Sequence, residues 1–285
     1  MKNRTVILGI DGLPYTFIKK FTNKGHLPNI RKLIEEGVIF KQMSASIPEV
    51  SSTSWSCIFT GKNPAEHGIY GFTDLIPGTY SMSFPNFKNV RCEAFWQREK
   101  NKNKKHVIIN VPSTYPAEEL NGFLVSGFVS LDLDKAVYPA EELQKLKEDG
   151  YEIDVDAGKV NDSKDLFLNE LFKTLEKRTE LGMRKWDELD WDVFFFVVTG
   201  TDRLEHFFWD AIEDENNKYH DRVMEFFDKT DEVVGKFLDK MSENDSLIMV
   251  SDHGMEQINY NVYLNKFLKE EGYLFLEKIR LKSCL

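Results

Sequence analysis

Short, almost continuous apolar runs alternate with segments of helical periodicity along most of this chain. The runs have the length of strands and lie at 5–10, 106–111, 122–125, 192–199 and 246–250. Helical segments are expected between them, at 27–36, 54–59, 93–99, 164–189 and 219–241. Strands that are apolar on both faces must be covered on both sides. The alternation therefore predicts an α/β fold in which helices cover both faces of a mostly parallel central sheet.

No stretch of low complexity divides the 285 residues, so the sequence predicts one domain over residues 1–285. Residues 112–163 differ from the rest because they are rich in Pro, Gly, Asp and Glu and carry only short apolar stretches. We expect this segment to be an insertion that forms a small cap over the edge of the sheet.

The net charge of −10 narrows the classes of function. Proteins that bind nucleic-acid polymers rely on basic residues that neutralise phosphates, so an acidic chain argues against that class. The apolar run at the N-terminus is too short to cross a membrane and is followed by no cleavage site of a signal peptide. Cys57, Cys92 and Cys284 form no Cys-x-x-Cys pair and indicate no disulfide framework. We expect a cytoplasmic protein without a membrane partner, and the oligomeric state stays open.

Metal-binding side chains follow three of the predicted strands. Asp11 closes the first strand, Asp202 and His206 follow the fourth, and Asp252 and His253 follow the last. The carboxyl ends of parallel strands meet at one edge of a sheet, where open α/β folds bind their ligands. Asp202 and His206 would lie one turn apart on a helix face, where they can bind one ion. Two of these groups also have a simpler reading. Asp11 can cap a helix, and Asp202 with His206 can be a solvated pair on a helix face.

The sequence SDHG at the end of the last predicted strand carries a geometric constraint. Neighbouring residues within a strand point to opposite faces, so Asp252 and His253 can share one ion only if the strand ends before them. Gly254 is expected to let the chain turn sharply there, with backbone angles that other residues rarely adopt.

The segment SSTSWS places five hydroxyl groups in residues 51–56, at an apparent helix start. Free N–H groups and the helix dipole favour a phosphate or an oxyanion at such a place. Any one of these serines, taken alone, reads more readily as an N-cap. Carboxylates, imidazoles and a hydroxyl together indicate metal-assisted phosphoryl transfer, since a divalent ion lowers the pKa of a bound hydroxyl and offsets phosphoryl charge.

Four motifs in order resemble those of the alkaline phosphatase superfamily and, within it, of the type I phosphodiesterase/nucleotide pyrophosphatase family. They are GIDGL from residue 9, PEVSSTSWSCIFTGKNPAEHGIYGF from residue 48, TGTDRLEH from residue 199 and SDHG from residue 251. The resemblance runs from residue 6 to about residue 275 and implies the superfamily's three-layer α/β/α sandwich with a mostly parallel sheet.

On the matching positions, the resemblance implies two divalent metal ions, Zn²⁺ or alternatively Mn²⁺. The implied ligands are carboxylates, imidazoles and one hydroxyl: Asp11, Asp252, His253 and Ser51 for one ion, and Asp202 and His206 for the other. Ser51 is the implied nucleophile, with Ser52 as the alternative if the register slips by one. The implied reaction is a phosphodiesterase or nucleotide pyrophosphatase reaction on a small phosphate ester or nucleotide-type substrate, through a phosphoseryl intermediate.

The resemblance also implies a third protein ligand of the second ion, a histidine well downstream of SDHG. No histidine follows His253 in this sequence. We therefore expect either a chain that is incomplete at its C-terminus or a weakened second metal site. The alternative functions are a phosphomutase or phosphonate hydrolase of the same superfamily, or a truncated metal-binding remnant without activity. A sulfatase is disfavoured, because the residues after Ser51 contain neither the Pro nor the Arg of its motif.

Overall fold

The computed structural model describes residues 3–275, which belong to two separate units. The large unit comprises residues up to Met255, and the small unit begins at Glu256. The described part of the small unit, residues 256–275, contains the helix α9 (Leu264–Glu270). The single domain over residues 1–285 stays a prediction.

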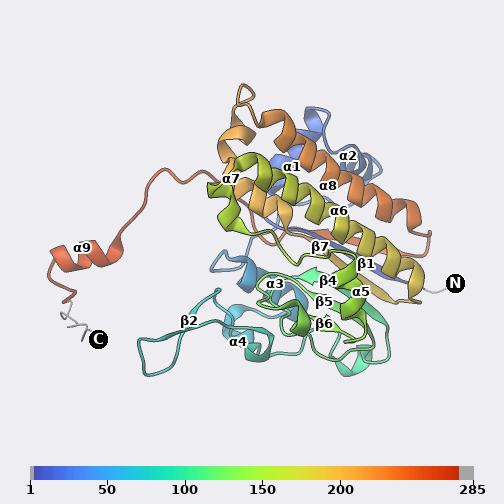
Figure 1. Ribbon diagram of the computed structural model, residues 1–285, viewed down its shortest axis with the longest axis horizontal. Helices are drawn as coiled ribbons and strands as arrows, with labels where there is room; N and C mark the ends of the chain where they lie inside the picture. Colours follow the sequence, from blue (N-terminus) through green and yellow to red (C-terminus); the bar gives the residue numbers. More distant parts are fainter. Residues whose placement is uncertain (1–2, 276–285) are drawn as a thin grey trace. The chain divides into compact units, whose positions relative to one another are not determined.

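Within the described part of the large unit, a six-stranded sheet has the order β6-β5-β4-β7-β1-β8 (Figure 1). Its neighbouring strands are parallel, apart from the antiparallel pair of β5 and β6. The five predicted strands agree with the observed ones to within one residue at each end, and the predicted α/β class is confirmed. The strands are β1 (Thr5–Ile10), β4 (His106–Val111), β5 (Gly122–Ser126), β6 (Val137–Tyr138), β7 (Val193–Val198) and β8 (Ser246–Val250).

Helices cover both faces of this sheet (Figure 1). Along β1, Val6 and Leu8 point into a larger core, whereas Ile7 packs against a smaller core on the other face. The helix of the smaller core is α3 (Ser51–Thr60). The helices of the larger core are α1 (Tyr15–Asn23), α2 (Pro28–Glu35), α5 (Glu142–Glu148), α6 (Lys164–Glu188), α7 (Gly200–Glu213) and α8 (His220–Lys240).

The remaining elements are short. They are α4 (Pro64–His67), the hairpin of β2 (Asp74–Leu75) and β3 (Met82–Ser83), and the 3₁₀ turns η1 (Phe87–Asn89), η2 (Glu99–Asn101), η3 (Leu133–Lys135) and η4 (Ala157–Asn161).

The helix predicted at 93–99 is wrong. Residues 93–98 form turns, and helical structure begins there only with the 3₁₀ turn η2. The Gln97 side chain accepts a hydrogen bond from the Ala94 backbone N–H, while the Gln97 N–H donates to the Ala94 carbonyl. This local ring of bonds closes a tight turn, which buries Trp96 in the smaller core.

Segment 112–163 supplies β5 and β6 to one edge of the sheet and then α5. Its later part reaches α7, where the Asp154 carboxylate accepts hydrogen bonds from Arg203. Its role as a cap stays a prediction. Cys57 and Cys92 are free thiols, and Cys284 lies outside the described residues. Between residues 3 and 275, no helix combines the length and the apolar character that a membrane span needs.

The strand order brings the carboxyl ends of three strands together, because β1 lies between β7 and β8. The hydroxyl of Thr201 donates to the Asp11 carbonyl at 2.5 Å, which ties the start of α7 to the end of β1. On the opposite face, Trp55 of α3 lies directly over β1. A Cβ atom on Gly9 would come within 2.3 Å of the Trp55 ring, so glycine is required for this close approach.

Candidate active site

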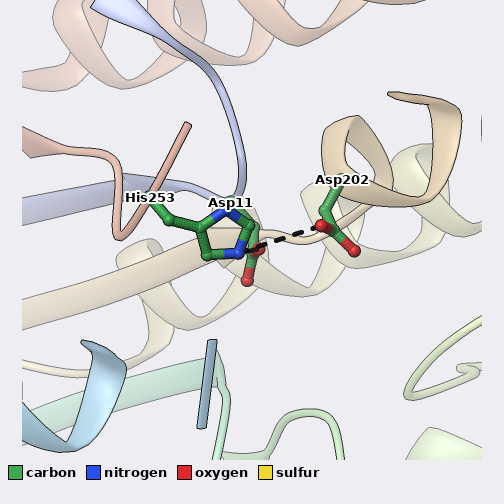
Figure 2. Close-up of side chains that lie close together, drawn as sticks. All are labelled: Asp11, Asp202 and His253. Atoms are coloured by element: carbon green, nitrogen blue, oxygen red, sulfur yellow. Dashed lines mark ion pairs between the residues drawn. The ribbon is translucent and has the colours of Figure 1, made fainter. Parts of the chain in front are cut away.

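Ligand atoms from three separate chain segments gather at the carboxyl ends of β1, β7 and β8. Asp11, Asp202 and His253 each offer one ligand atom, and these atoms lie within 4.8 Å of one another (Figure 2). Nε2 of His253 lies 3.5 Å from Oδ1 of Asp11 and 3.9 Å from Oδ1 of Asp202. The structure thus brings together residues that are far apart in the sequence, at the edge where the sequence placed them.

Asp252 joins this cluster, because β8 ends at Val250 and the chain then turns. Oδ2 of Asp252 lies 3.4 Å from Nε2 of His253, while Oδ1 accepts the Gly12 backbone N–H at 3.1 Å. Within the described residues, the buried Oδ2 has no hydrogen-bond donor. A buried carboxylate oxygen without a donor, beside an imidazole nitrogen, is a donor set that fits a metal cation.

The glycine that the geometry requires is Gly12 rather than Gly254. Gly12 has φ +74°, and a Cβ atom on it would come within 3.1 Å of the Asp202 backbone. Gly254 does not lie in the left-handed region, and a Cβ atom on it would make only ordinary contacts with Pro14. The expectation of a special backbone conformation at Gly254 is therefore wrong, because the bend after β8 lies at Asp252 and Gly254 has no positive φ.

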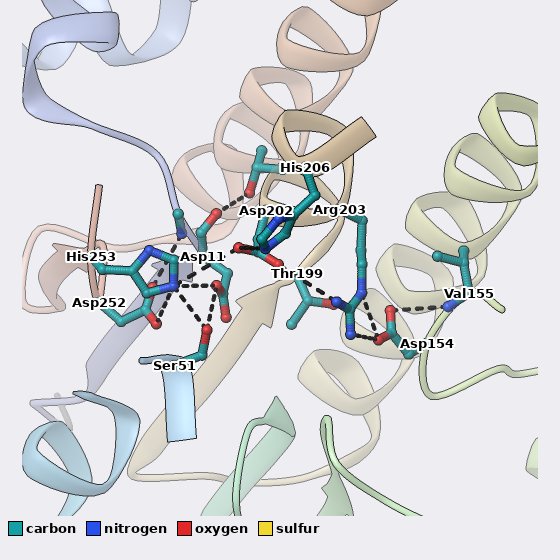
Figure 3. Close-up of polar contacts among 12 residues, drawn as sticks. Asp11, Ser51, Asp154, Val155, Thr199, Asp202, Arg203, His206, Asp252 and His253 are labelled. Atoms are coloured by element: carbon teal, nitrogen blue, oxygen red, sulfur yellow. Dashed lines mark hydrogen bonds and ion pairs between the residues drawn. The ribbon is translucent and has the colours of Figure 1, made fainter. Parts of the chain in front are cut away.

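The hydroxyl of Ser51 lies inside the cluster. Its Oγ is 2.8 Å from Nε2 of His253 and 3.4 Å from Oδ1 of Asp11 (Figure 3). Ser52 has a different environment, because its hydroxyl donates to the Gly71 carbonyl at 3.3 Å and accepts from Ser113 at 3.0 Å. Of the two candidate nucleophiles, only Ser51 therefore contacts the predicted ligands.

The orientation of His253 follows from its second ring nitrogen. Nδ1 lies 2.9 Å from the Gly254 carbonyl, which can only accept a hydrogen bond. Nδ1 therefore carries the proton of the neutral ring, and Nε2 presents its lone pair to Ser51 and the carboxylates. A histidine that binds a metal ion is commonly held in this way by a backbone carbonyl.

The helix α3 begins at Ser51, with Val50 as its N-cap and no side-chain cap. Ser54 is the first residue whose N–H donates back to the Val50 carbonyl. The N–H groups of residues 51–53 are the unpaired donors that every helix start leaves. They lie beside the Ser51 hydroxyl, where the helix dipole favours an anion such as a phosphoryl group.

Burial and neighbouring charges raise the pKa values of Asp11 and Asp252. Burial is the largest cause for Asp11, whose pKa is well above its ordinary value, and the charges of Asp252 and Asp202 raise it further. Burial also raises the pKa of Asp252, to about 7. A divalent cation would reverse this penalty, because it stabilises the ionised forms.

Glu205 is a site-adjacent acid that sequence analysis missed. Its side chain is buried, and neither carboxyl oxygen has a hydrogen-bond partner in the described part of the chain. Burial, followed by the charges of Asp202, Asp11 and Asp252, raises its pKa well above the ordinary value. Its position three residues after Asp202 on a predicted helix face was the available signal.

His206 lies at the margin of the cluster. Its Nε2 is 3.3 Å from Oδ1 of Asp202, and this hydrogen bond is the largest cause of the raised pKa of His206. About half of its side chain is exposed, in contrast to His253. The predicted pairing of Asp202 with His206 is present, but in the described structure His206 makes no ion pair with another predicted ligand.

A comparison with models of protein families gives a match, which covers nearly the whole chain. Residues 5–283 match the model of the type I phosphodiesterase/nucleotide pyrophosphatase family. The chain belongs to this family. The four motifs thus indicated the right family from the sequence. A comparison with curated protein sequences finds no significant match.

Three solved structures share the fold of this chain. Phosphonoacetate hydrolase from Sinorhizobium meliloti 1021, in complex with phosphonoformate, superposes with a TM-score of 0.66 and 16% identity over 94% of this chain. The complex with phosphonoacetate gives a TM-score of 0.68 and 15% identity over 95%. Murine ectonucleotide pyrophosphatase/phosphodiesterase 5 gives 0.54 and 13% over 88% of this chain and 57% of its own. The present chain spans 62% of the length of the hydrolase. At these identities the likeness shows the alkaline-phosphatase-like fold alone.

Proposed function

We propose that this chain is a metal-dependent phosphohydrolase that cleaves small phosphate esters or nucleotide-type diesters through a phosphoseryl intermediate on Ser51. The observation that carries the proposal is the Ser51 hydroxyl, 2.8 Å from Nε2 of His253 within a cluster of buried carboxylates. The family assignment supports the class of reaction.

The donor set fits divalent metal ions. Carboxylate oxygens and imidazole nitrogens suit Zn²⁺, with Mn²⁺ as the alternative. The Asp252 oxygen that lacks a donor and the raised pKa values of Asp11 and Asp252 both support a cation at this place. We assign Asp11, Asp252, His253 and Ser51 to one ion, and Asp202 and His206 to a second. Bound ions would favour ionisation of the serine hydroxyl and offset the charge of the phosphoryl group.

The chain's own residues supply the rest of the reaction. Nε2 of His253 lies 2.8 Å from Oγ of Ser51, so both atoms would face the same bound ion, and the Ser51 hydroxyl proton would be lost to solvent. Oγ then forms a bond to phosphorus while the bond to the leaving oxygen breaks. The backbone N–H of Ser52, in the first turn of α3, binds a phosphoryl oxygen. Attack of water on the phosphoseryl ester releases the product and restores the serine.

A phosphonate hydrolase is the second candidate. The observation in its favour is the match to phosphonoacetate hydrolase over 94% of this chain, in a structure that contains phosphonoformate. A phosphomutase and a metal-binding remnant without activity were the other sequence alternatives, and no observation favours either. A cytoplasmic location stays a prediction.

An assay on three substrates tests the proposal. Protein stripped with a chelator is given Zn²⁺ or Mn²⁺ and then bis(p-nitrophenyl) phosphate, p-nitrophenyl phosphate or phosphonoacetate. We expect turnover that depends on the metal ion, with the diester cleaved faster than the monoester, in line with the family assignment. Cleavage of phosphonoacetate alone would favour the second candidate. Absence of metal-dependent turnover on all three substrates would contradict both.

A further inference from the structure

Two of the three site carboxylates share a simple arrangement. In each, one oxygen is held by a fixed donor and the other faces Nε2 of His253. Oδ2 of Asp11 accepts from Nε1 of Trp55 at 2.7 Å, and Oδ1 of Asp252 accepts from the Gly12 N–H at 3.1 Å. The second oxygens, Oδ1 of Asp11 and Oδ2 of Asp252, lie 3.5 Å and 3.4 Å from Nε2 of His253. The donors therefore decide which oxygen of each carboxylate faces the centre.

Asp202 follows the same pattern with a charged partner. Its Oδ1 faces the centre, 3.3 Å from Nε2 of His206 and 3.9 Å from Nε2 of His253. Its Oδ2 faces the opposite way, 3.7 Å from Nη1 of Arg203 (Figure 3). Arg203 therefore lies on the outer side of Asp202 as Trp55 does for Asp11, but as an ion pair rather than a hydrogen-bond donor.

Arg203 is itself held by segment 112–163. Its Nε and Nη2 donate to Oδ2 of Asp154 at 3.0 Å and 2.6 Å, and its guanidinium lies over the Phe128 ring, 4.2 Å from the centroid. Oδ1 of Asp154 accepts the Val155 N–H at 2.9 Å, which fixes the carboxylate. Both side chains of the Arg203–Asp154 pair are only 14% exposed. A planar fork held on one edge and stacked on a ring has little freedom to move.

We propose that Arg203 is a positioning residue that turns Oδ1 of Asp202 towards the metal centre, and that segment 112–163 sets its place through Asp154 and Phe128. This inference rests on the proposed metal centre. The inference extends that proposal, because segment 112–163 would then contact the proposed metal ligand Asp202 through Arg203. Partners of this kind typically change metal affinity 10- to 100-fold when they are removed.

The sign of the effect separates positioning from simple charge. Arg203 carries a positive charge beside a cation site, so Coulomb repulsion alone predicts that its removal tightens metal binding. Positioning predicts the opposite, because Asp202 would lose its fixed orientation. The experiment is a calorimetric titration of Zn²⁺ into chelator-stripped, full-length wild type and Arg203→Gln. We expect at least about tenfold weaker binding in the variant. Unchanged or tighter binding would overturn the proposal.

Arg203→Lys keeps the charge and tests the geometry, because an ammonium cannot contact Asp154 and Asp202 through a rigid fork. We expect weaker Zn²⁺ binding than in wild type, whereas wild-type affinity in this variant would overturn the proposal. Arg184→Gln is the matched control, since Arg184 of α6 forms a partly buried ion pair with Asp149 at the end of α5 and an ion pair with Glu188, neither of which is a site residue. We expect it to bind Zn²⁺ like wild type, with a metal-free melting temperature similar to that of Arg203→Gln. Weakening of Zn²⁺ binding by the control as well would show a general loss of structure and would also overturn the proposal.

The titration also separates this inference from the proposed function. A wild-type chain that binds Zn²⁺ but cleaves no substrate would contradict the function and leave the comparison of variants decisive for Arg203. A wild-type chain that binds no Zn²⁺ would contradict both.

Discussion

Ser51→Ala is expected to abolish phosphoester turnover, with kcat reduced at least about 1,000-fold, while the protein stays folded. The physical reason is that the variant loses the oxygen that forms the bond to phosphorus, and loss of a nucleophile typically leaves only the contribution of binding and charge stabilisation. The measurement is the metal-dependent turnover of a chromogenic diester, with the far-ultraviolet spectrum of each variant as the test of folding.

Ser52→Ala is the control for the register of the nucleophile. The Ser52 hydroxyl bonds with Gly71 and Ser113 rather than with the metal ligands, and alanine keeps the backbone N–H of this position. We expect activity within about tenfold of wild type, because the two hydrogen bonds that the variant loses, about 1 kcal/mol each, involve none of the proposed reacting groups. Full activity of Ser51→Ala would remove Ser51 from the mechanism, and a dead Ser52→Ala beside it would move the nucleophile by one residue.

The metal-free protein is expected to lose stability as the pH rises from about 6.5 to 8.5, with a fall in melting temperature on the order of 5 °C for a loss of about 2 kcal/mol. Asp11, Asp252 and Glu205 have pKa values above their ordinary range, and that of Asp252 is about 7. A group whose pKa is raised on folding stabilises the protein below its unfolded pKa, and this stability is lost as the pH rises through the folded pKa. The raised pKa of His206 acts in the same direction.

The pH window avoids groups with the opposite sign. Burial lowers the pKa of His106 to about 4 and also lowers that of His67, so their contributions rise with pH but only up to the ordinary histidine value of 6.5. Above that value, the carboxyls and His206 determine the slope. Excess Zn²⁺ is expected to reverse the trend, because it binds the ionised ligands and binds them more tightly at higher pH. A melting temperature of the metal-free protein that stays constant or rises over this window would contradict the account of the buried carboxyls.

The strands and the positions of the proposed ligands along the chain were predictable, because both depend on local sequence. The buried strands are continuous apolar runs, and Asp11, Asp202 and Asp252 follow three of them directly. In a parallel sheet the strand ends lie along one edge, and the strand order, with β1 between β7 and β8, then brings these residues together. The glycine required at this site was predicted at Gly254 but is Gly12. The sequence could not show this, because the requirement comes from how closely α7 approaches the end of β1.

The groups that hold the ligands were not predictable, because each is a contact between distant segments. Trp55 donates to Asp11 across 44 positions, and Arg203 reaches back 49 positions to Asp154. Neither pair has a spacing that a strand or helix period would reveal. Glu205 lies within the quoted motif TGTDRLEH, but its burial without a partner follows only from the packing of α7 against the centre of the sheet. The sequence therefore indicates the candidate ligands, and tertiary packing determines their orientation.

The most direct test of a phosphoseryl mechanism at this centre is the chemical state of Ser51 during turnover. Metal-loaded wild-type protein is mixed with a diester, quenched in acid within one turnover, digested and analysed by tandem mass spectrometry. The account predicts a phosphoryl ester on Ser51, absent from protein stripped of metal ions and from Ser51→Ala. A phosphoryl group on Ser52, or substrate turnover in which no serine of α3 is ever modified, would contradict it.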